Sequence, residues 1–214
     1  MRFLIVFAVC GLMTTGLARA APIVITDVEL PSGKVISILT PLAVTGLAGQ
    51  LQLTTSTGLH LTAWCIDLYH DIYTGAGQSL RFNPGPVSTN SHGQTLSALQ
   101  TREIAGLATY GDAQIALGNH SADFSAAVQT AIWSIEYDVP ALTYVAGPSH
   151  ALVNSLIALA PALTGSATAL IALDGQQTLI TSSTGVPEPA TLTVLGAAIA
   201  CLAAARRKAR RALL

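Results

Sequence analysis

Charged, aromatic and sulfur-containing side chains are all scarce in this 214-residue chain. Charged residues make up 10% of it, aromatic residues 5%, and there are three cysteines. Two of these, Cys10 and Cys201, lie in hydrophobic stretches near the two ends, so the central part holds Cys65 alone. The sequence therefore excludes a disulfide framework and leaves one unpaired thiol whose chemistry needs an explanation.

Basic side chains are especially rare in the middle of the chain. Residues 21–181 contain three basic residues, Lys34, Arg81 and Arg102, against ten acidic ones, which gives a net charge of −7. An acidic surface repels the phosphate backbone of DNA and RNA, so we expect no nucleic-acid partner. The segment has the length of one ordinary domain.

The N-terminus has the parts of a secretory signal peptide. The basic start Met1-Arg2 precedes an apolar run over residues 3–17, and the run closes with the small-x-small pattern Ala18-Arg19-Ala20. Such a segment is cleaved during export, here after Ala20. The apolar run is too short to span a membrane. We therefore assign residues 1–20 to a signal peptide and predict an exported protein.

The C-terminus combines a linker, an apolar run and a basic cluster. Residues 182–189 form a linker that ends in Pro-Glu-Pro. Residues 190–205 are apolar, although sixteen residues is slightly short of the ~20 that cross a bilayer as a helix. The basic tail, residues 206–214, would remain on the cytoplasmic side. We predict a transmembrane helix over 190–205 that anchors the precursor in the inner membrane.

Pro-Glu-Pro, an apolar stretch and a terminal basic cluster, in this order, resemble the PEP-CTERM sorting signal of Gram-negative bacteria. The resemblance covers residues 186–211. It implies recognition by an exosortase-type membrane enzyme, cleavage near the motif, and release to the cell surface or the extracellular matrix. A plain C-terminal membrane anchor is the alternative. The residues that carry the signal are Pro187, Glu188, Pro189, Arg206 and Arg207.

Between the two ends, the hydrophobic period changes from that of strands to that of helices and back. This order indicates an α+β domain over residues 21–181, a β-sandwich or barrel with an inserted helical subdomain at about 95–160. We expect Gly111 to end the first helix and Ser121 or Asp123 to cap the second. The predicted strands are 23–28, 35–40, 46–54, 59–69, 80–82, 167–173 and 176–181, and the predicted helices are 95–110, 121–136 and 149–159.

Cys65 and Gln129 form the candidate reactive pair. The strand around Cys65 carries apolar residues on both faces, which indicates a central strand with a covered cysteine. Gln129 shares a helix face with Trp133, so its amide is expected to point inward. A buried amide without partners costs about 1–3 kcal/mol. A buried amide beside a cysteine can instead react. The thiolate attacks the amide carbon and expels ammonia, which leaves an intramolecular thioester.

The segments 64–68 and 128–133 resemble the paired motifs of bacterial Cys–Gln thioester domains of the TQXA type, whose better-known members are Gram-positive surface adhesins. The resemblance spans residues 55–180 and implies a thioester between Cys65 and Gln129. Val128 stands where the family has Thr, so no role of that hydroxyl carries over. The residues expected to support the thioester are Trp64, Asp67, Ala131 and Trp133.

Three other constellations are possible but less specific. A cysteine hydrolase could pair Cys65 with a histidine, although no histidine lies in a characteristic motif. Four aspartates could bind calcium, but their spacing matches no known calcium-binding loop. Five tyrosines could form a sugar-binding platform, but their positions at segment ends fit a packing role better. Asp67 and Glu136 could either support the thioester ring or be ordinary acidic residues at the surface, and we favour the second role. The groups are His70 and His120; Asp67, Asp71, Asp112 and Asp123; and Tyr69, Tyr73, Tyr110, Tyr137 and Tyr144.

We therefore expect an exported surface or matrix protein that captures a nucleophile covalently through its thioester. The target would be an amine- or hydroxyl-bearing protein or polysaccharide. Because the acyl group is transferred once, the protein would not be an enzyme, and this chemistry needs no cofactor or metal. The alternative is a non-covalent binding or structural component of an extracellular polysaccharide matrix, in which Cys65 is an unreactive core residue.

Overall fold

The computed structural model describes residues 21–88, 93, 95–138 and 142–182. The predicted signal peptide, the Pro-Glu-Pro motif, the predicted transmembrane helix and the basic tail lie outside the described residues. Within the described ranges, no helix is both long enough and apolar enough to cross a membrane. The described residues all belong to one compact unit, Ala21–Pro187.

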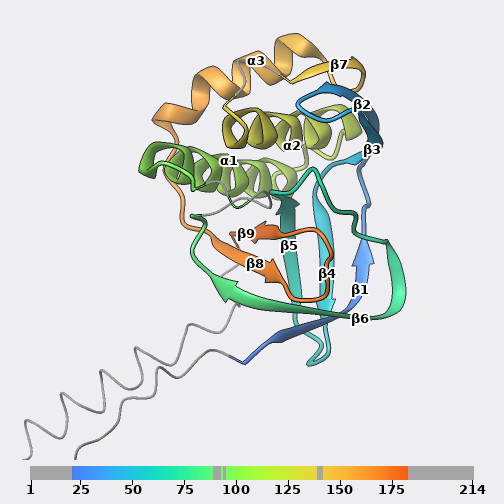
Figure 1. Ribbon diagram of the computed structural model, residues 1–214. Coiled ribbons are helices and arrows are strands. Elements are labelled where there is room, and N and C mark those ends of the chain that lie inside the picture. Colours follow the sequence, from blue (N-terminus) through green and yellow to red (C-terminus); the bar gives the residue numbers. More distant parts are fainter. Residues whose placement is uncertain (1–20, 89–92, 94, 139–141, 183–214) are drawn as a thin grey trace, which may run out of the picture. The chain divides into compact units, whose positions relative to one another are not determined.

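Six antiparallel strands close into a barrel (Figure 1). Cys65 is the last residue of β5, which lies between β4 and β9, and it pairs with Leu179 of β9. The barrel alternative of the sequence prediction is thus confirmed. In order around the barrel, the strands are β1 (Ile23–Glu29), β4 (Leu51–Thr55), β5 (His60–Cys65), β9 (Leu179–Thr181), β8 (Thr168–Ala172) and β6 (Gly75–Gly85).

Three helices and a small sheet lie over one end of the barrel (Figure 1). α2 (Ala122–Glu136) packs between α1 (Ala98–Ala116) and α3 (His150–Leu159), and it also contacts β5. A helix that is apolar nearly all round is a buried helix, which explains the composition of α2. The small sheet has the order β3 (Val44–Ala48), β2 (Lys34–Thr40), β7 (Thr143–Ala146), and a 3-10 turn, Ala160–Ala162, follows α3.

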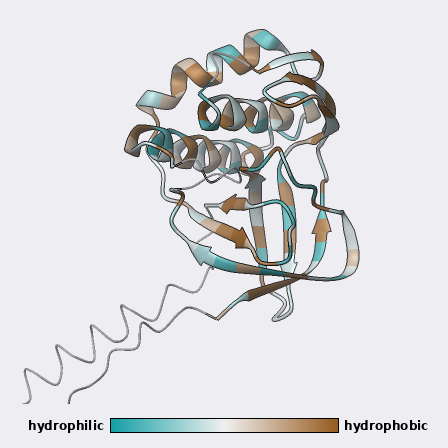
Figure 2. Ribbon diagram, viewed as in Figure 1, coloured by the Kyte–Doolittle hydropathy of each residue, from teal (hydrophilic) through white to brown (hydrophobic). Residues whose placement is uncertain are grey.

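Local sequence signals account for the starts of α1 and α2 and for much of the strand pattern. Ser97 and Gln100 form a capping box at the start of α1. The Ser121 hydroxyl accepts a hydrogen bond from the Phe124 amide at 3.1 Å, so Ser121 rather than Asp123 caps α2. Figure 2 shows apolar and polar bands on the barrel strands, and burial alternates residue by residue along β4.

Gly111 does not end the first helix, contrary to the prediction. α1 continues through it to Ala116. A Cβ atom at Gly111 would lie 2.7 Å from the Trp64 ring and 2.8 Å from Val128. The glycine therefore permits the close approach of α1 to β5 and α2, a role that a short helix stripe does not reveal.

Four strand predictions were wrong in extent. The predicted strand 46–54 is split between β3 and β4 of different sheets, and β7 was not predicted. β6 extends well beyond the predicted short strand 80–82 in both directions. β5 ends at Cys65 rather than at Tyr69, because the Asp67 carboxylate accepts hydrogen bonds from backbone amides that follow it and forms a turn. The predicted strand 176–181 begins only at Leu179.

Candidate functional site

The Gln129 amide is paired with the main chain of Cys65. The Cys65 backbone N–H donates to Gln129 Oε1 at 2.8 Å, and Gln129 Nε2 donates to the Cys65 carbonyl at 2.7 Å. Gln129 is fully buried and Cys65 nearly so, as predicted for both residues. The pairing joins the middle of α2 to the end of β5 and fixes the glutamine amide beside the residue that carries the thiol.

The Cys65 thiol itself is bonded to Gln177, a residue that the sequence reasoning missed. Cys65 Sγ donates to Gln177 Oε1 at 2.9 Å, while Gln177 Nε2 donates to the Asp67 carbonyl. The Gln177 backbone N–H also donates to the Asp71 carbonyl, at 3.2 Å. Gln177 lies in the loop before β9, far from Cys65 in sequence. Its sequence context, a polar residue between a turn and a short strand, contains no motif that would have identified it.

Asp67 is a buried acid and not a surface one. Its side chain is nearly fully inaccessible. Oδ1 accepts hydrogen bonds from the backbone amides of Tyr69 at 2.8 Å and His70 at 3.1 Å, and Oδ2 accepts from the Thr178 amide at 3.4 Å. Oδ2 also lies 2.7 Å from Nδ1 of His70. These partners compensate for the loss of water around the carboxylate and hold the turn that follows Cys65.

Glu136 is also buried, so its reading as a surface acid is wrong as well. It lies at the last position of α2, two helical turns after Gln129 and on the same face. Burial raises the pKa of Glu136 well above its usual range, and the charge of Asp67 raises it further, whereas the Tyr137 hydroxyl lowers it. Glu136 is therefore protonated under conditions in which exposed glutamates are charged.

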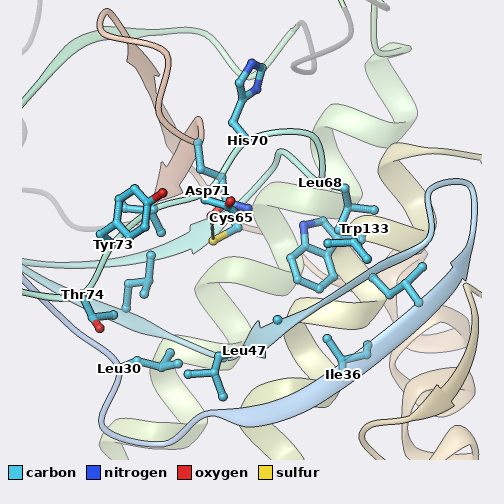
Figure 3. Close-up of a pocket in the computed structure, with 17 residues that line it drawn as sticks. Leu30, Ile36, Leu47, Cys65, Leu68, His70, Asp71, Tyr73, Thr74 and Trp133 are labelled. Atoms are coloured by element: carbon cyan, nitrogen blue, oxygen red, sulfur yellow. Dashed lines mark hydrogen bonds between the residues drawn. The ribbon is translucent and has the colours of Figure 1, made fainter.

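The surroundings of Cys65 keep its thiol protonated. Burial is the largest cause that raises the pKa of the Cys65 thiol, and the charge of Asp67 adds to it. A cysteine hydrolase needs a thiolate stabilised by a positive neighbour. A cavity opens at the Cys65 thiol, and among the described residues that line it His70 is the only histidine. Its ring points away from Cys65 in Figure 3 and contacts Asp67 instead. The described geometry therefore provides no Cys–His pair, and His120 lies exposed before α2.

A cavity of about 370 Å³ opens in front of the Cys65 thiol (Figure 3). Cys65 and Gln177 supply polar atoms to its wall, and Trp133 of α2 lines it beside Leu68. His70, Asp71, Tyr73 and Thr74 contribute further polar groups, and the Tyr73 side chain is 73% exposed. The apolar part of the wall comes from Leu30, Ile36, Ile38, Val44, Leu47, Leu51 and Ile72. A small nucleophile could therefore reach the sulfur along a mainly apolar passage.

Three of the four predicted supporting residues, Trp64, Asp67 and Ala131, lie outside the cavity wall. Trp64 is buried on the opposite side of β5 from the thiol, where its indole N–H donates to Asp112 at 3.0 Å. Ala131 is fully buried in α2. Trp64 therefore anchors the strand that carries Cys65, whereas Trp133 lies at the cavity itself.

The four aspartates considered for calcium are not brought together. Asp112 accepts hydrogen bonds from the side chains of Thr62, Trp64 and Ser182, whereas Asp123 forms an ion pair with Lys34 at 2.5 Å. In the part of the chain that the structure describes, no group of three or more His, Cys, Asp or Glu residues is placed to hold a metal ion.

The tyrosines are dispersed over separate ring contacts. Tyr69 packs edge-on against Tyr137 with ring centroids 5.8 Å apart, and Tyr110 packs against Phe124 at 6.4 Å. Tyr144 stacks on His150 at 4.1 Å. These contacts agree with the packing role that their positions at segment ends suggested.

Comparison with known proteins identifies the C-terminal signal. The PEP-CTERM protein-sorting motif matches residues 185–208, which confirms the predicted sorting signal and points to an exported protein that exosortase processes. No curated protein matches the chain. A similar solved structure is the N-terminal thioester domain of fibronectin-binding protein SfbI from Streptococcus pyogenes, with 13% identity, 74% of this chain covered, 95% of that chain covered and a TM-score of 0.41.

Proposed function

We propose that this exported protein captures a partner covalently through an internal thioester between Cys65 Sγ and Gln129 Cδ. The observation that carries the proposal is the two-way hydrogen bonding of the buried Gln129 amide to the main chain of the cysteine residue. This pairing holds the acyl donor against the main chain of the residue that carries the sulfur nucleophile before any reaction. Holding two groups together in this way supplies much of the entropy that an intermolecular reaction would lose.

Thioester formation and capture are two acyl transfers on the same carbon. In the first, the Sγ–Cδ bond forms, the Cδ–Nε2 bond of Gln129 breaks, and the thiol proton leaves with the nitrogen as ammonia. In the second, an amine or hydroxyl attacks Cδ, the Sγ–Cδ bond breaks, and the proton of the nucleophile returns to the sulfur. The product is an amide or ester bond between Gln129 and the partner. The protein is consumed in one reaction and is not an enzyme.

The cavity supports this proposal because it opens at the Cys65 sulfur, to which the electrophilic Gln129 Cδ would be bonded in the thioester. Its mainly apolar wall would limit the hydrolysis of a thioester by bulk water, while its volume of about 370 Å³ admits an amine or hydroxyl on a slender stem. The partner would be a surface protein or polysaccharide that bears such a group. We further propose that the precursor is held in the inner membrane until exosortase cleavage places the domain at the cell surface or releases it.

A second candidate function is non-covalent. The thiol donates its hydrogen bond to Gln177 rather than to Gln129, and both groups of the Gln129 amide are satisfied by the main chain. These two facts also fit a core cysteine and a core glutamine with structural roles only. The domain would then be a binding or structural component of an extracellular polysaccharide matrix.

Intact-mass measurement of the purified protein separates the two functions. If the thioester forms, the wild-type protein is lighter by one ammonia than its sequence predicts, and methylamine addition raises its mass to one methylene group above the calculated value while it frees one titratable thiol. The Cys65→Ala variant has the unshifted mass and does not take up methylamine. A wild-type protein with the full calculated mass and a free thiol from the outset would refute covalent capture and leave the non-covalent function.

A further inference from the structure

Gln177 offers the Cys65 sulfur a hydrogen-bond acceptor whose orientation is fixed. Because Gln177 Nε2 donates to the Asp67 carbonyl, a flip of the side-chain amide would place two oxygens against each other. Oε1 therefore remains directed at Sγ, at 2.9 Å. The side chain is 8% exposed, so water replaces this contact poorly. The Gln177 oxygen that faces the sulfur can therefore accept a hydrogen bond but cannot donate one.

This contact exists in only one of the two chemical states of the proposed thioester. In the open state, Cys65 carries a thiol and donates to Gln177. In the closed state, the sulfur is bonded to Cδ of Gln129 and has no proton, so the buried Gln177 oxygen loses its donor. A buried acceptor without a donor is unfavourable. Gln177 therefore stabilises the open state relative to the closed one.

We propose that Gln177 is a positioning residue that sets the balance between the closed thioester and the open thiol through its hydrogen bond to Cys65. This inference rests on the proposed thioester and extends it. Opening by ammonia reforms the Gln129 amide: the Sγ–Cδ bond breaks, a Cδ–N bond forms, and one ammonia proton moves to the sulfur. At that point Gln177 Oε1 accepts a hydrogen bond from the new S–H group, which favours the opened product and so drives capture towards completion.

The size of the effect follows from the strength of one such bond. An intramolecular hydrogen bond stabilises by about 1 kcal/mol, and a thiol is a weak donor. Removal of the Gln177 acceptor should therefore shift the opening equilibrium about two- to fivefold towards the thioester. The concentration of ammonia that opens half of the molecules should rise by the same factor.

Titration of the purified protein with ammonium chloride at constant pH tests this. Intact mass gives the fraction of thioester at each concentration, and the equilibrium is approached both from the closed protein and from the protein first opened with excess ammonia. The test variant is Gln177→Met, which keeps the length of the side chain and removes the acceptor. The matched control is Gln176→Met in the same loop, because among the described residues the Gln176 side-chain oxygen has no hydrogen-bond partner. Gln177→Asn, which is too short to reach the sulfur, serves as a second test variant if Gln177→Met does not fold.

The outcomes separate this inference from the proposed function. A midpoint that rises in the Gln177 variant and stays at the wild-type value in Gln176→Met supports the inference. An equal midpoint in wild type and Gln177 variant, with the thioester present in both, overturns it and leaves the proposed function intact. A wild-type protein that shows no loss of ammonia at any concentration overturns both.

Discussion

The pairing of Gln129 with the Cys65 main chain makes a strong prediction about stability that does not require the thioester. Cys65→Ala removes the thiol but keeps the backbone N–H and C=O to which Gln129 is bonded. In this background no covalent bond can form. A second change, Gln129→Met, keeps an unbranched side chain of similar length and removes both halves of the amide. The difference between the single and the double variant therefore measures the hydrogen-bonded pair alone.

The expected loss is about 2 to 4 kcal/mol. Each unpaired buried backbone group costs about 1–3 kcal/mol, and two such groups are left at Cys65. The lower half of the summed range applies because both groups belong to one residue, so their costs are not independent. Thr130→Ala in the same background is the control. It removes a fully buried hydroxyl whose bond, 2.7 Å to the Ala126 carbonyl, stays within α2.

Urea denaturation followed by circular dichroism measures the free energy of unfolding of each variant. The double variant should lose the stated amount, whereas the Thr130 control should lose less than about 1.5 kcal/mol, the net value of one typical hydrogen bond. A loss below about 1 kcal/mol in the double variant would show that Gln129 and the Cys65 main chain are not paired in solution. The geometric basis of the proposed function would then be wrong.

Two further predictions concern residues around the site. Gly111→Ala should destabilise the protein by about 1–3 kcal/mol in thermal or urea unfolding, because the new methyl group would overlap the Trp64 ring; an unchanged stability would contradict the close packing of α1 on β5. Glu136 has a folded-state pKa above its unfolded value, so its contribution to stability is fully present below the ordinary carboxyl pKa and is lost as the pH rises through the folded-state pKa. Unfolding free energies measured across that window should therefore fall with rising pH in the wild type, and Glu136→Gln should flatten this dependence; equal slopes would contradict the buried, neutral carboxyl beside Asp67.

Much of the fold could be predicted because its determinants are local. The strands of β-branched residues, the capped second helix and the closing hairpin follow from periodicity and from caps such as Ser121. What failed depended on distant contacts. Gly111 has the residue type of a helix end, yet its role is set by Trp64, which comes from a strand far away in the sequence. Similarly, β3 and β4 read as one strand until their partners in two different sheets separate them.

The candidate site divides in the same way. The inward direction of Gln129 and the covered position of Cys65 follow from helix and strand periodicity, and both were predicted. Acidic side chains gave the opposite result: charged residues are rarely buried, which favours a surface position for Asp67 and Glu136, whereas both are buried in the structure. Asp67 is buried because it accepts backbone hydrogen bonds from its own turn, and Gln177 joins the site only through the closure of the barrel.

The most direct test of the thioester is to locate the atom that carries the captured amine. The purified protein is reacted with methylamine, digested, and mapped by tandem mass spectrometry. The account predicts an N-methylamide on Gln129 in the wild type, with the Cys65 thiol newly free to alkylation, and no methylamide in the Cys65→Ala variant. A methylamide on Gln177 would show that the glutamine bonded to the thiol is the acyl donor, and would contradict both the proposed Cys65–Gln129 bond and the positioning role of Gln177. No methylamide on either glutamine would contradict the covalent account altogether.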